Sequence, residues 1–101
     1  MVIIFNYQNM KKASIYIGAN NTTKKVEIEK VKLLVGNLFE GYTIYEIIGY
    51  WHNIPEQSIK VEIIIADERE LAVIRLCKEL KRALNQEAIM VEIVETTAVF
   101  I

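Results

Sequence analysis

The order of strand-like and helix-like segments predicts an α+β domain of the ferredoxin-like type, with a four-stranded antiparallel sheet and two helices on one face. Three observations lead to this fold class. A chain of 101 residues has room for one domain with one core. Its composition, 52% hydrophobic and 25% charged, is that of a folded globular protein. Segments with strand and helix periodicity follow one another in the order β-α-β-β-α-β.

The first β-α unit occupies residues 14–39. The segment Ser14 to Gly18 alternates and is rich in β-forming residues, which predicts a strand. Polar residues from Asn20 to Thr23 then predict the capped start of a helix that runs from about Lys24 to Phe39. Apolar residues recur at helical spacing along that stretch.

The second half of the chain predicts two strands, a helix and a last strand. The strands are Tyr42 to Trp51 and Ser58 to Ala66, joined by the link His52 to Gln57. Asp67, with Glu70 three residues later, has the spacing of a capping box and predicts a helix to about Asn85. Ala88 to Glu95 predicts the final strand, followed by a tail.

The domain organisation that we expect is a short extension, residues 1–13, ahead of a single α+β ligand-binding domain at residues 14–101. Met10-Lys11-Lys12 would make an ordinary amino terminus, so the residues before it are either a loose arm or an added strand. The apolar run Val2 to Phe5 is too short for a signal peptide or a membrane span.

The second face of the predicted sheet is also apolar. Tyr16, Ile64, Met90 and Val94 lie out of phase with the core positions, and Tyr42 to Trp51 is apolar at both parities. A sheet that is apolar on both faces is usually covered on both. We therefore expect a homo-oligomer, either a dimer or an assembly of dimers.

Composition excludes several classes of function. The net charge of −1 argues against binding of DNA or RNA, which usually needs a basic excess. The single cysteine, Cys77, falls on the apolar side of the second helix, which predicts a buried thiol, a reducing compartment and a cytoplasmic protein. With one histidine, His52, and no nucleophile motif, we expect no metal, no cofactor and no enzymatic activity.

Three features could hold a ligand. Arg75, Lys78 and Arg82 form a cationic row on the outer side of the second helix, where Arg69 lies in the first turn. The turn before the first helix could offer backbone amides near Thr22, with help from Lys24, to a phosphate. Tyr50 and Trp51, at a strand end, could stack on a base. Each has a simpler alternative: a solvated basic face, plain capping, and a core or interface aromatic.

Residues from about Ser14 to Glu95 resemble the first-described family of Thoeris anti-defence proteins, small phage proteins that sequester cyclic ADP-ribose-type signals made by bacterial immune enzymes. The resemblance rests on Gly41-Tyr42-Thr43-Ile44-Tyr45, Gly49-Tyr50-Trp51, the turn with Glu56 and Ser58, and Asn85-Gln86-Glu87-Ala88-Ile89. It implies a non-enzymatic oligomer that binds glycocyclic ADP-ribose, and in some members cyclic oligonucleotides, near subunit contacts without cleaving them.

The function that we expect is therefore sequestration of a small cyclic nucleotide-like immune signal, in the host bacterial cytoplasm if a phage encodes the chain. No nucleic acid or membrane partner is expected. Two alternatives stay open at this point: a small oligomeric regulatory or scaffold domain that binds a protein partner, and a dimeric ferredoxin-like enzyme.

Overall fold

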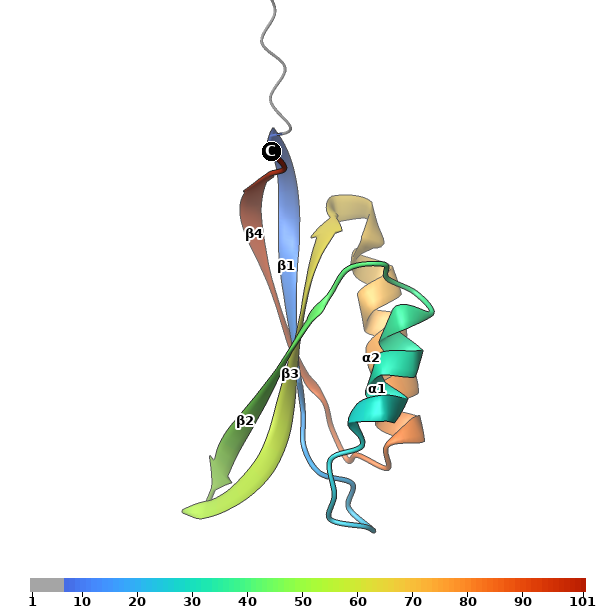
Figure 1. Cartoon of the computed structure of the whole chain (residues 1–101), viewed down its shortest axis with the longest axis vertical. Coiled ribbons are helices and arrows are strands. Elements are labelled where there is room, and N and C mark those ends of the chain that lie inside the picture. Colours follow the sequence, from blue (N-terminus) through green and yellow to red (C-terminus); the bar gives the residue numbers. More distant parts are fainter. Residues whose placement is uncertain (1–6) are drawn as a thin grey trace, which may run out of the picture.

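The computed structural model describes residues 7–101 and has the expected ferredoxin-like fold. Its elements are β1 (Tyr7–Ile17), α1 (Ile28–Gly36), β2 (Thr43–Trp51), β3 (Ile54–Ala66), the 3-10 turn η1 (Asp67–Arg69), α2 (Glu70–Ala83) and β4 (Met90–Val99). The strands form one antiparallel sheet in the order β2-β3-β1-β4. Both helices cover the same face of this sheet (Figure 1).

The core lies between the helices and the sheet face that they cover. Alternate residues of β1 and β3 point into it, and so does the inner stripe of α2, in keeping with the two-residue and 3.6-residue periods. The largest fully buried side chains are Ile15, Ile17, Ile59, Ile63, Leu76 and Leu80, with Val31, Val35, Val61 and Val73. Cys77 is buried among them, as the sequence predicts.

The other sheet face, here called the open face, has no layer over it in the described part of the chain. The apolar residues expected on this face are there and are partly exposed, for example Ile64 (41%), Met90 (57%) and Val94 (50%). Their exposure matches the alternation in the sequence. That a second copy of the chain covers them stays a prediction.

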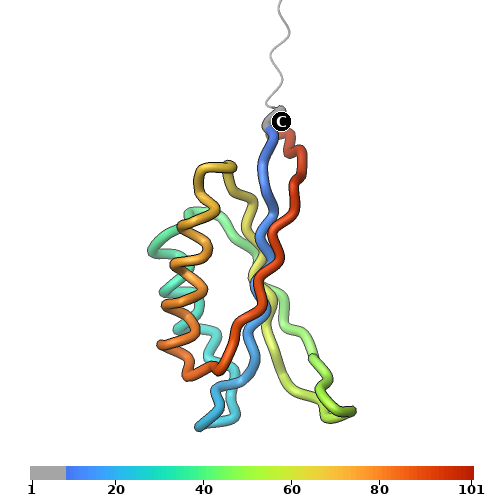
Figure 2. The backbone as a smooth tube through the Cα atoms, turned by 180° about the vertical axis from the view of Figure 1, so that it is seen from behind, coloured from blue at the N-terminus to red at the C-terminus, as the bar shows by residue number. Residues whose placement is uncertain are grey.

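The strands are longer than their shared register, so each end of the sheet continues as a two-stranded ribbon. β1 pairs with β3 only from Met10–Ala66 to Ile17–Ile59. Beyond this, β2 and β3 pair only with each other over residues 47–58, here called the hairpin arm. At the opposite end, β1 and β4 alone continue to Tyr7–Val99. The two ribbons project from opposite ends in both Figure 1 and Figure 2.

Residues 7–13 of the expected extension form the first part of β1. They pair with β4, and from Met10 onward also with β3. This pairing also explains why β4 runs to Val99 instead of ending at Glu95, where the sequence predicts a tail. Residues 1–6 lie outside the described part of the chain.

The first helix begins later than the sequence predicts, at Ile28 instead of Lys24. Asn20 is responsible, because its side-chain oxygen accepts from the amides of Thr22 (2.8 Å) and Thr23 (3.1 Å) and so closes a turn of its own. Lys24 then has a φ of 62°, which cannot belong to a right-handed helix. The expected polar cap is therefore a turn that lies ahead of the helix.

The link expected at residues 52–57 is also shorter in the structure. His52 and Asn53 both have positive φ, 49° and 62°, the conformation that a two-residue hairpin turn needs. β3 consequently starts at Ile54, and Pro55 lies in it opposite Tyr50. Proline is compatible with this position because that side of the arm has no further strand to receive an amide.

The expected capping box of Asp67 and Glu70 does not form. Neither η1 nor α2 has a side-chain hydrogen bond at its start. Glu70 instead pairs with Lys11 of β1, with 2.6 Å between Nζ and Oε2. A contact between residues 59 apart thus replaces the local one, which the spacing of the sequence alone does not reveal.

Candidate functional site

Three segments that are distant in the sequence meet around the peptide of Ala19. The Glu56 side chain, from the hairpin arm, accepts a hydrogen bond from the Ala19 amide at 2.8 Å. The Gln86 side chain, from the loop between α2 and β4, donates to the Ala19 carbonyl at 2.7 Å. Asn85 of the same loop donates to the Thr22 hydroxyl at 2.6 Å. These bonds hold the end of β1, the arm and the α2–β4 loop in one arrangement.

A cavity of about 610 Å³ opens where these segments meet, here called the Gly18 pocket. Its floor comes from the end of β1 and the start of β4, and one wall comes from the hairpin arm. The residues that line it are Tyr16, Ile17, Gly18, Asn21, Ile47, Gly49, Trp51, Glu56, Ser58, Gln86, Glu87, Ala88 and Met90. Its volume is in the range of small-molecule sites.

The chemistry of this pocket is acidic and aromatic. Glu56 and Glu87 contribute carboxylates, Tyr16 and Trp51 contribute rings, and the described lining contains no lysine or arginine. Such a wall suits a ligand with a flat ring system and positive charge, because carboxylates and ring faces both attract cations. An anionic ligand would have only backbone and side-chain dipoles to balance its charge there.

A lysine on the neighbouring open face is already engaged. Lys60 lies 3.3 Å from the Glu62 carboxylate, and its ammonium sits 5.8 Å and 5.4 Å from the ring centres of Tyr16 and Tyr45. The hydrogen bond to Glu62 raises the pKa of Lys60, and a hydrogen bond to Glu92 raises the pKa of Tyr16. The positive charge of Lys60 is therefore balanced by Glu62 and does not have to be balanced by a ligand in the pocket.

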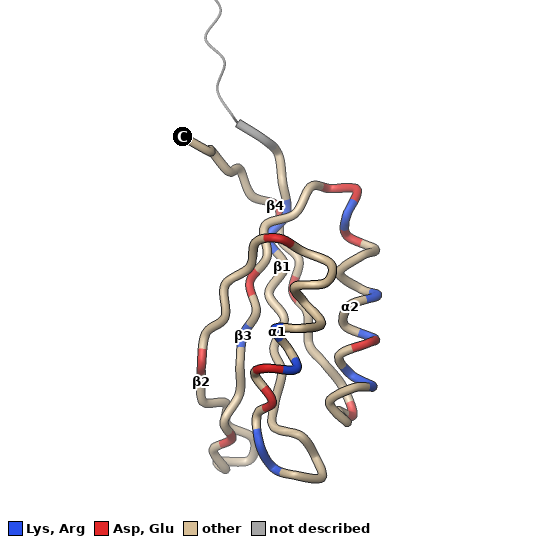
Figure 3. Tube along the Cα trace, turned by 45° about the vertical axis from the view of Figure 1, so that its right-hand side comes forward, with Lys and Arg blue, Asp and Glu red and all other residues tan. Residues whose placement is uncertain are grey.

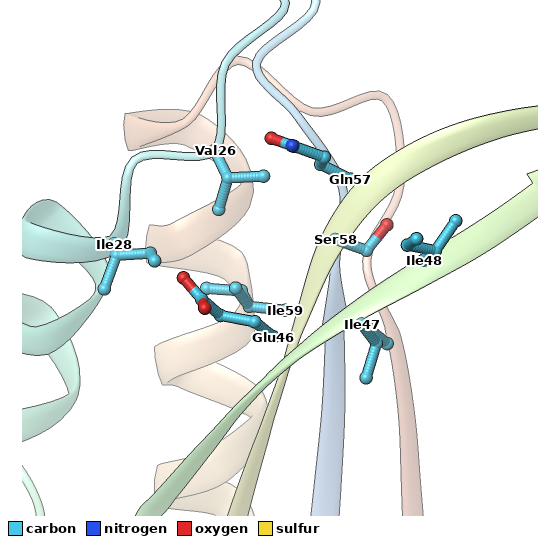
Figure 4. Close-up of a pocket in the computed structure, with 8 residues that line it drawn as sticks. All are labelled: Val26, Ile28, Glu46, Ile47, Ile48, Gln57, Ser58 and Ile59. Carbon is cyan, nitrogen blue, oxygen red and sulfur yellow. The ribbon is translucent and has the colours of Figure 1, made fainter.

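A second cavity, of about 390 Å³, lies on the helix side of the arm (Figure 4). It is lined by Val26, Ile28, Glu46, Ile47, Ile48, Gln57, Ser58 and Ile59. Most of these side chains are apolar, and the Glu46 carboxylate points in between Ile28 and Ile59 (Figure 4). We favour the Gly18 pocket as the ligand site because several polar groups converge on it from three segments, which is what fixes the orientation of a ligand.

The aromatic residues expected to stack on a base are separated. Trp51 lines the Gly18 pocket, where its ring meets that of His52 edge-on at 4.8 Å. Tyr50 points to the other side of the arm by strand alternation and is 69% exposed. The structure thus places only Trp51 of this pair at the pocket.

The arginines expected to bind phosphate do not reach the pocket lining. Arg69 stacks on the Phe39 ring at 4.6 Å and donates to the Leu38 carbonyl at 2.9 Å. Arg75 and Arg82 are exposed on the outer side of α2, where Figure 3 shows a row of basic residues. Arg69 is thus held against Phe39, apart from the exposed outer row of α2 that contains Arg75 and Arg82.

The turn expected to present free amides to a phosphate has none to offer at Thr22. Its amide and that of Thr23 donate to Asn20, and α1 starts only at Ile28, so the turn is not a helix N-terminus. Lys24 is exposed beside this turn.

Sequence reasoning did not select Gly18, Glu56 or Gln86 as site residues, because only the folded chain brings them together. Their visible signals were a glycine at a strand end and, for Glu56 and Gln86, a place among the residues that carry the Thoeris resemblance.

Among residues 7–101, none of the helices is both long and apolar enough to cross a membrane. The same part of the chain contains no group of three or more His, Cys, Asp or Glu side chains placed to hold a metal ion.

The sequence matches no protein-family model, and no curated protein matches it. Solved structures do match. A phage SAM lyase in the apo state has a TM-score of 0.71 and 23% identity, over 99% of this chain and 94% of that one. CPII, a nitrogen regulatory PII-like protein from Thiomonas intermedia bound to ADP, AMP and bicarbonate, has a TM-score of 0.64 and 16% identity, over 91% and 94%. A PII-like signalling protein from Thermus thermophilus has a TM-score of 0.55 and 21% identity, over 93% and 92%.

The chain shares its fold with PII-like proteins and a phage SAM lyase. At these identities the likeness establishes the arrangement of strands and helices. The CPII structure contains the adenine compounds ADP and AMP, and the name of the phage SAM lyase contains a third, S-adenosylmethionine.

Proposed function

We propose that the chain binds S-adenosylmethionine in the Gly18 pocket and cleaves it as a lyase. The observation that carries this proposal is the charge of the described pocket lining, which has two carboxylates and no basic side chain. S-adenosylmethionine has a sulfonium, an ammonium and one carboxylate, so it is a cation overall. A cation that leaves water needs opposite charge or ring faces around it, and Glu56 and Trp51 supply both.

Cleavage of S-adenosylmethionine needs no nucleophile, acid or base from the protein. An oxygen of the ligand's own carboxylate attacks Cγ, the carbon of the amino-acid part that is bonded to the sulfonium, so that a C–O bond forms and the Cγ–S bond breaks. The electron pair of the broken bond stays on sulfur, which leaves as the neutral thioether 5′-methylthioadenosine, and the remainder closes as a lactone. No proton, metal or second reactant takes part. A pocket that folds the ligand into the reactive geometry accelerates such a step through proximity.

The proposal departs from the sequence-based expectation of a non-enzymatic binder. That expectation rested on missing nucleophile and metal patterns, which matter for reactions that need an added nucleophile, acid or base. An intramolecular displacement with a neutral leaving group needs none of them. The names of the fold neighbours support an adenine-containing ligand, and that of the phage SAM lyase supports the reaction.

The test is incubation of the purified chain with S-adenosylmethionine, followed by mass spectrometry of the small molecules. We expect 5′-methylthioadenosine and the lactone to accumulate faster than in buffer. Glu56→Gln should slow this reaction, whereas Arg75→Ala, on the outer side of α2, should leave it unchanged. Product formation at the buffer rate with native protein would contradict the lyase, and no heat of binding in calorimetry would contradict the ligand.

A second candidate function is sequestration of a cyclic ADP-ribose-type immune signal without cleavage, as the Thoeris anti-defence resemblance implies. It is favoured by the outer row of α2, where Arg75, Lys78 and Arg82 are exposed and make no ion pair within residues 7–101. A pyrophosphate carries about two negative charges, which arginine pairs with well.

This candidate makes the opposite prediction for the same two variants. Arg75→Ala should cost about 2–4 kcal/mol of affinity for glycocyclic ADP-ribose, on the order of 30- to 1000-fold. Glu56→Gln should have little effect on it. Ligand released by heat should have its original mass. Calorimetry with this compound, native and variant, therefore separates the two functions.

A further inference from the structure

Gly18 is a glycine for reasons of space. Its φ is not positive, so its backbone conformation is open to any residue. A Cβ built on Gly18 would lie 2.7 Å from Oε1 of Glu56 and 3.5 Å from Oε1 of Gln86. Two side-chain oxygens thus converge on the place that a side chain would fill. We call this the acceptor corner of the Gly18 pocket, formed by Gly18, Glu56 and Gln86.

The orientation of the Gln86 amide follows from its partners. Its nitrogen donates to the carbonyls of Ala19 (2.7 Å) and Leu84 (3.4 Å). The opposite orientation would set the amide oxygen against two carbonyl oxygens, which cannot donate. The oxygen of Gln86 therefore faces the corner. Glu56, as a carboxylate, also offers only acceptors there.

We propose that the acceptor corner seats the ammonium group of the ligand's amino-acid part, which makes Gly18 and Gln86 specificity-determining residues. This inference rests on the proposed function. An ammonium has three donors and a positive charge, so it can donate to both oxygens at once and pair with the Glu56 charge. The amino group of adenine suits the corner less, because the neighbouring ring nitrogen is an acceptor and would face the oxygens.

Two neutral-sulfur probes differ by the amino-acid part, which brings the ammonium together with a carboxylate. S-adenosylhomocysteine carries the amino-acid part, and 5′-methylthioadenosine shares the nucleoside and the sulfur but lacks it. For the native chain we expect S-adenosylhomocysteine to bind about tenfold or more tightly than 5′-methylthioadenosine, the effect of one charged hydrogen-bonded contact. The readout is the ratio of the two dissociation constants measured by calorimetry.

Gly18→Ala is the variant that tests the corner. The new methyl group would displace the end of the Glu56 side chain, which is flexible, so folding should survive. The matched control is Gly49→Ala in the same pocket, where a Cβ would meet only the Ser58 hydroxyl at 3.4 Å. We expect Gly18→Ala to abolish the preference for S-adenosylhomocysteine while 5′-methylthioadenosine binding changes by less than about threefold. Gly49→Ala should keep the preference.

The outcomes distinguish the two proposals. Equal loss of both probes in Gly18→Ala would overturn the ammonium assignment, as would a native chain that binds both probes alike. Should Gly18→Ala not fold, Glu56→Gln takes its place, because its amide oxygen can still accept from Ala19 while the charge is gone. Retention of the preference in that variant would also overturn the assignment. Failure of the native chain to bind S-adenosylmethionine and both probes would overturn the proposed function and this inference with it.

Discussion

Asn20 is the residue whose replacement should loosen the turn at residues 20–24 without touching the core. It is 8% exposed, and its side-chain oxygen accepts from the amides of Thr22 and Thr23. At about 0.5–1.5 kcal/mol for each bond, Asn20→Ala removes about 1–3 kcal/mol of stability. Both threonines are exposed, so water can satisfy the freed amides, and we expect the lower half of this range, about 1–2 kcal/mol. The melting temperature should then fall by about 5–10 °C.

Urea denaturation followed by circular dichroism measures this effect. Asn20→Asp should recover only part of the loss, because its carboxylate can accept the same two bonds but cannot donate to Glu27, as the Asn20 nitrogen does at 3.4 Å. Asn21→Ala, at the exposed neighbouring position, should change stability by less than about 0.5 kcal/mol. Equal stability of Asn20→Ala and Asn21→Ala would refute the reasoning that the Asn20 oxygen organises the turn.

Four further predictions follow from the same structure. Leu76→Ala, at a fully buried site, should cost about 2–5 kcal/mol in urea denaturation, whereas Leu71→Ala on the exposed side of α2 should change stability by less than about 0.5 kcal/mol. Burial raises the pKa of the Cys77 thiol from 9.0 to about 11. The neutral thiol therefore contributes its full stabilisation below pH 9.0, and this stabilisation is lost as the pH rises toward 11. Ellman's reagent at about pH 8 should therefore label the unfolded chain much faster than the native one, and equal rates would contradict this. Glu56→Gln should weaken S-adenosylmethionine binding by about 10- to 100-fold in calorimetry while Glu87→Gln weakens it less, and the reverse order would argue against Glu56 as the main charge partner. Light scattering should give a mass above the 11.7 kDa of one chain, and a monomer at micromolar concentration would contradict the oligomer.

The fold class could be predicted from the sequence because it depends on periodicity. Alternation in β3 places Ile59, Val61 and Ile63 on one face and Ile64 on the other, and the structure agrees. The start of α1 could not be predicted, since Asn20 used its side chain to close a turn where the pattern of polar residues indicated a helix cap. Local spacing cannot tell these two uses of an asparagine apart.

The candidate site was less accessible to sequence reasoning. Its defining contacts, Glu56 to Ala19 and Gln86 to Ala19, join residues 37 and 67 positions apart. Of the residues chosen from chemistry, Trp51 lines the pocket. The arginines carry the right charge for a phosphate but lie on the outer side of α2 or against Phe39. Charge type can be read from a sequence, whereas which side chains share a cavity depends on long-range packing.

The hairpin arm and the four-stranded part of the sheet should differ in amide hydrogen exchange. In the hairpin arm each strand has a partner on one side only, and the arm contributes little to the buried core. Its amides can therefore exchange through local opening at a lower free energy than global unfolding, whereas those of β1 and β3 at Ala13–Ile63 require the whole sheet to open. A ligand in the Gly18 pocket contacts the arm through Glu56, so its binding should slow exchange in residues 47–58, and it should also slow exchange in the central strands, because global opening destroys the pocket as well.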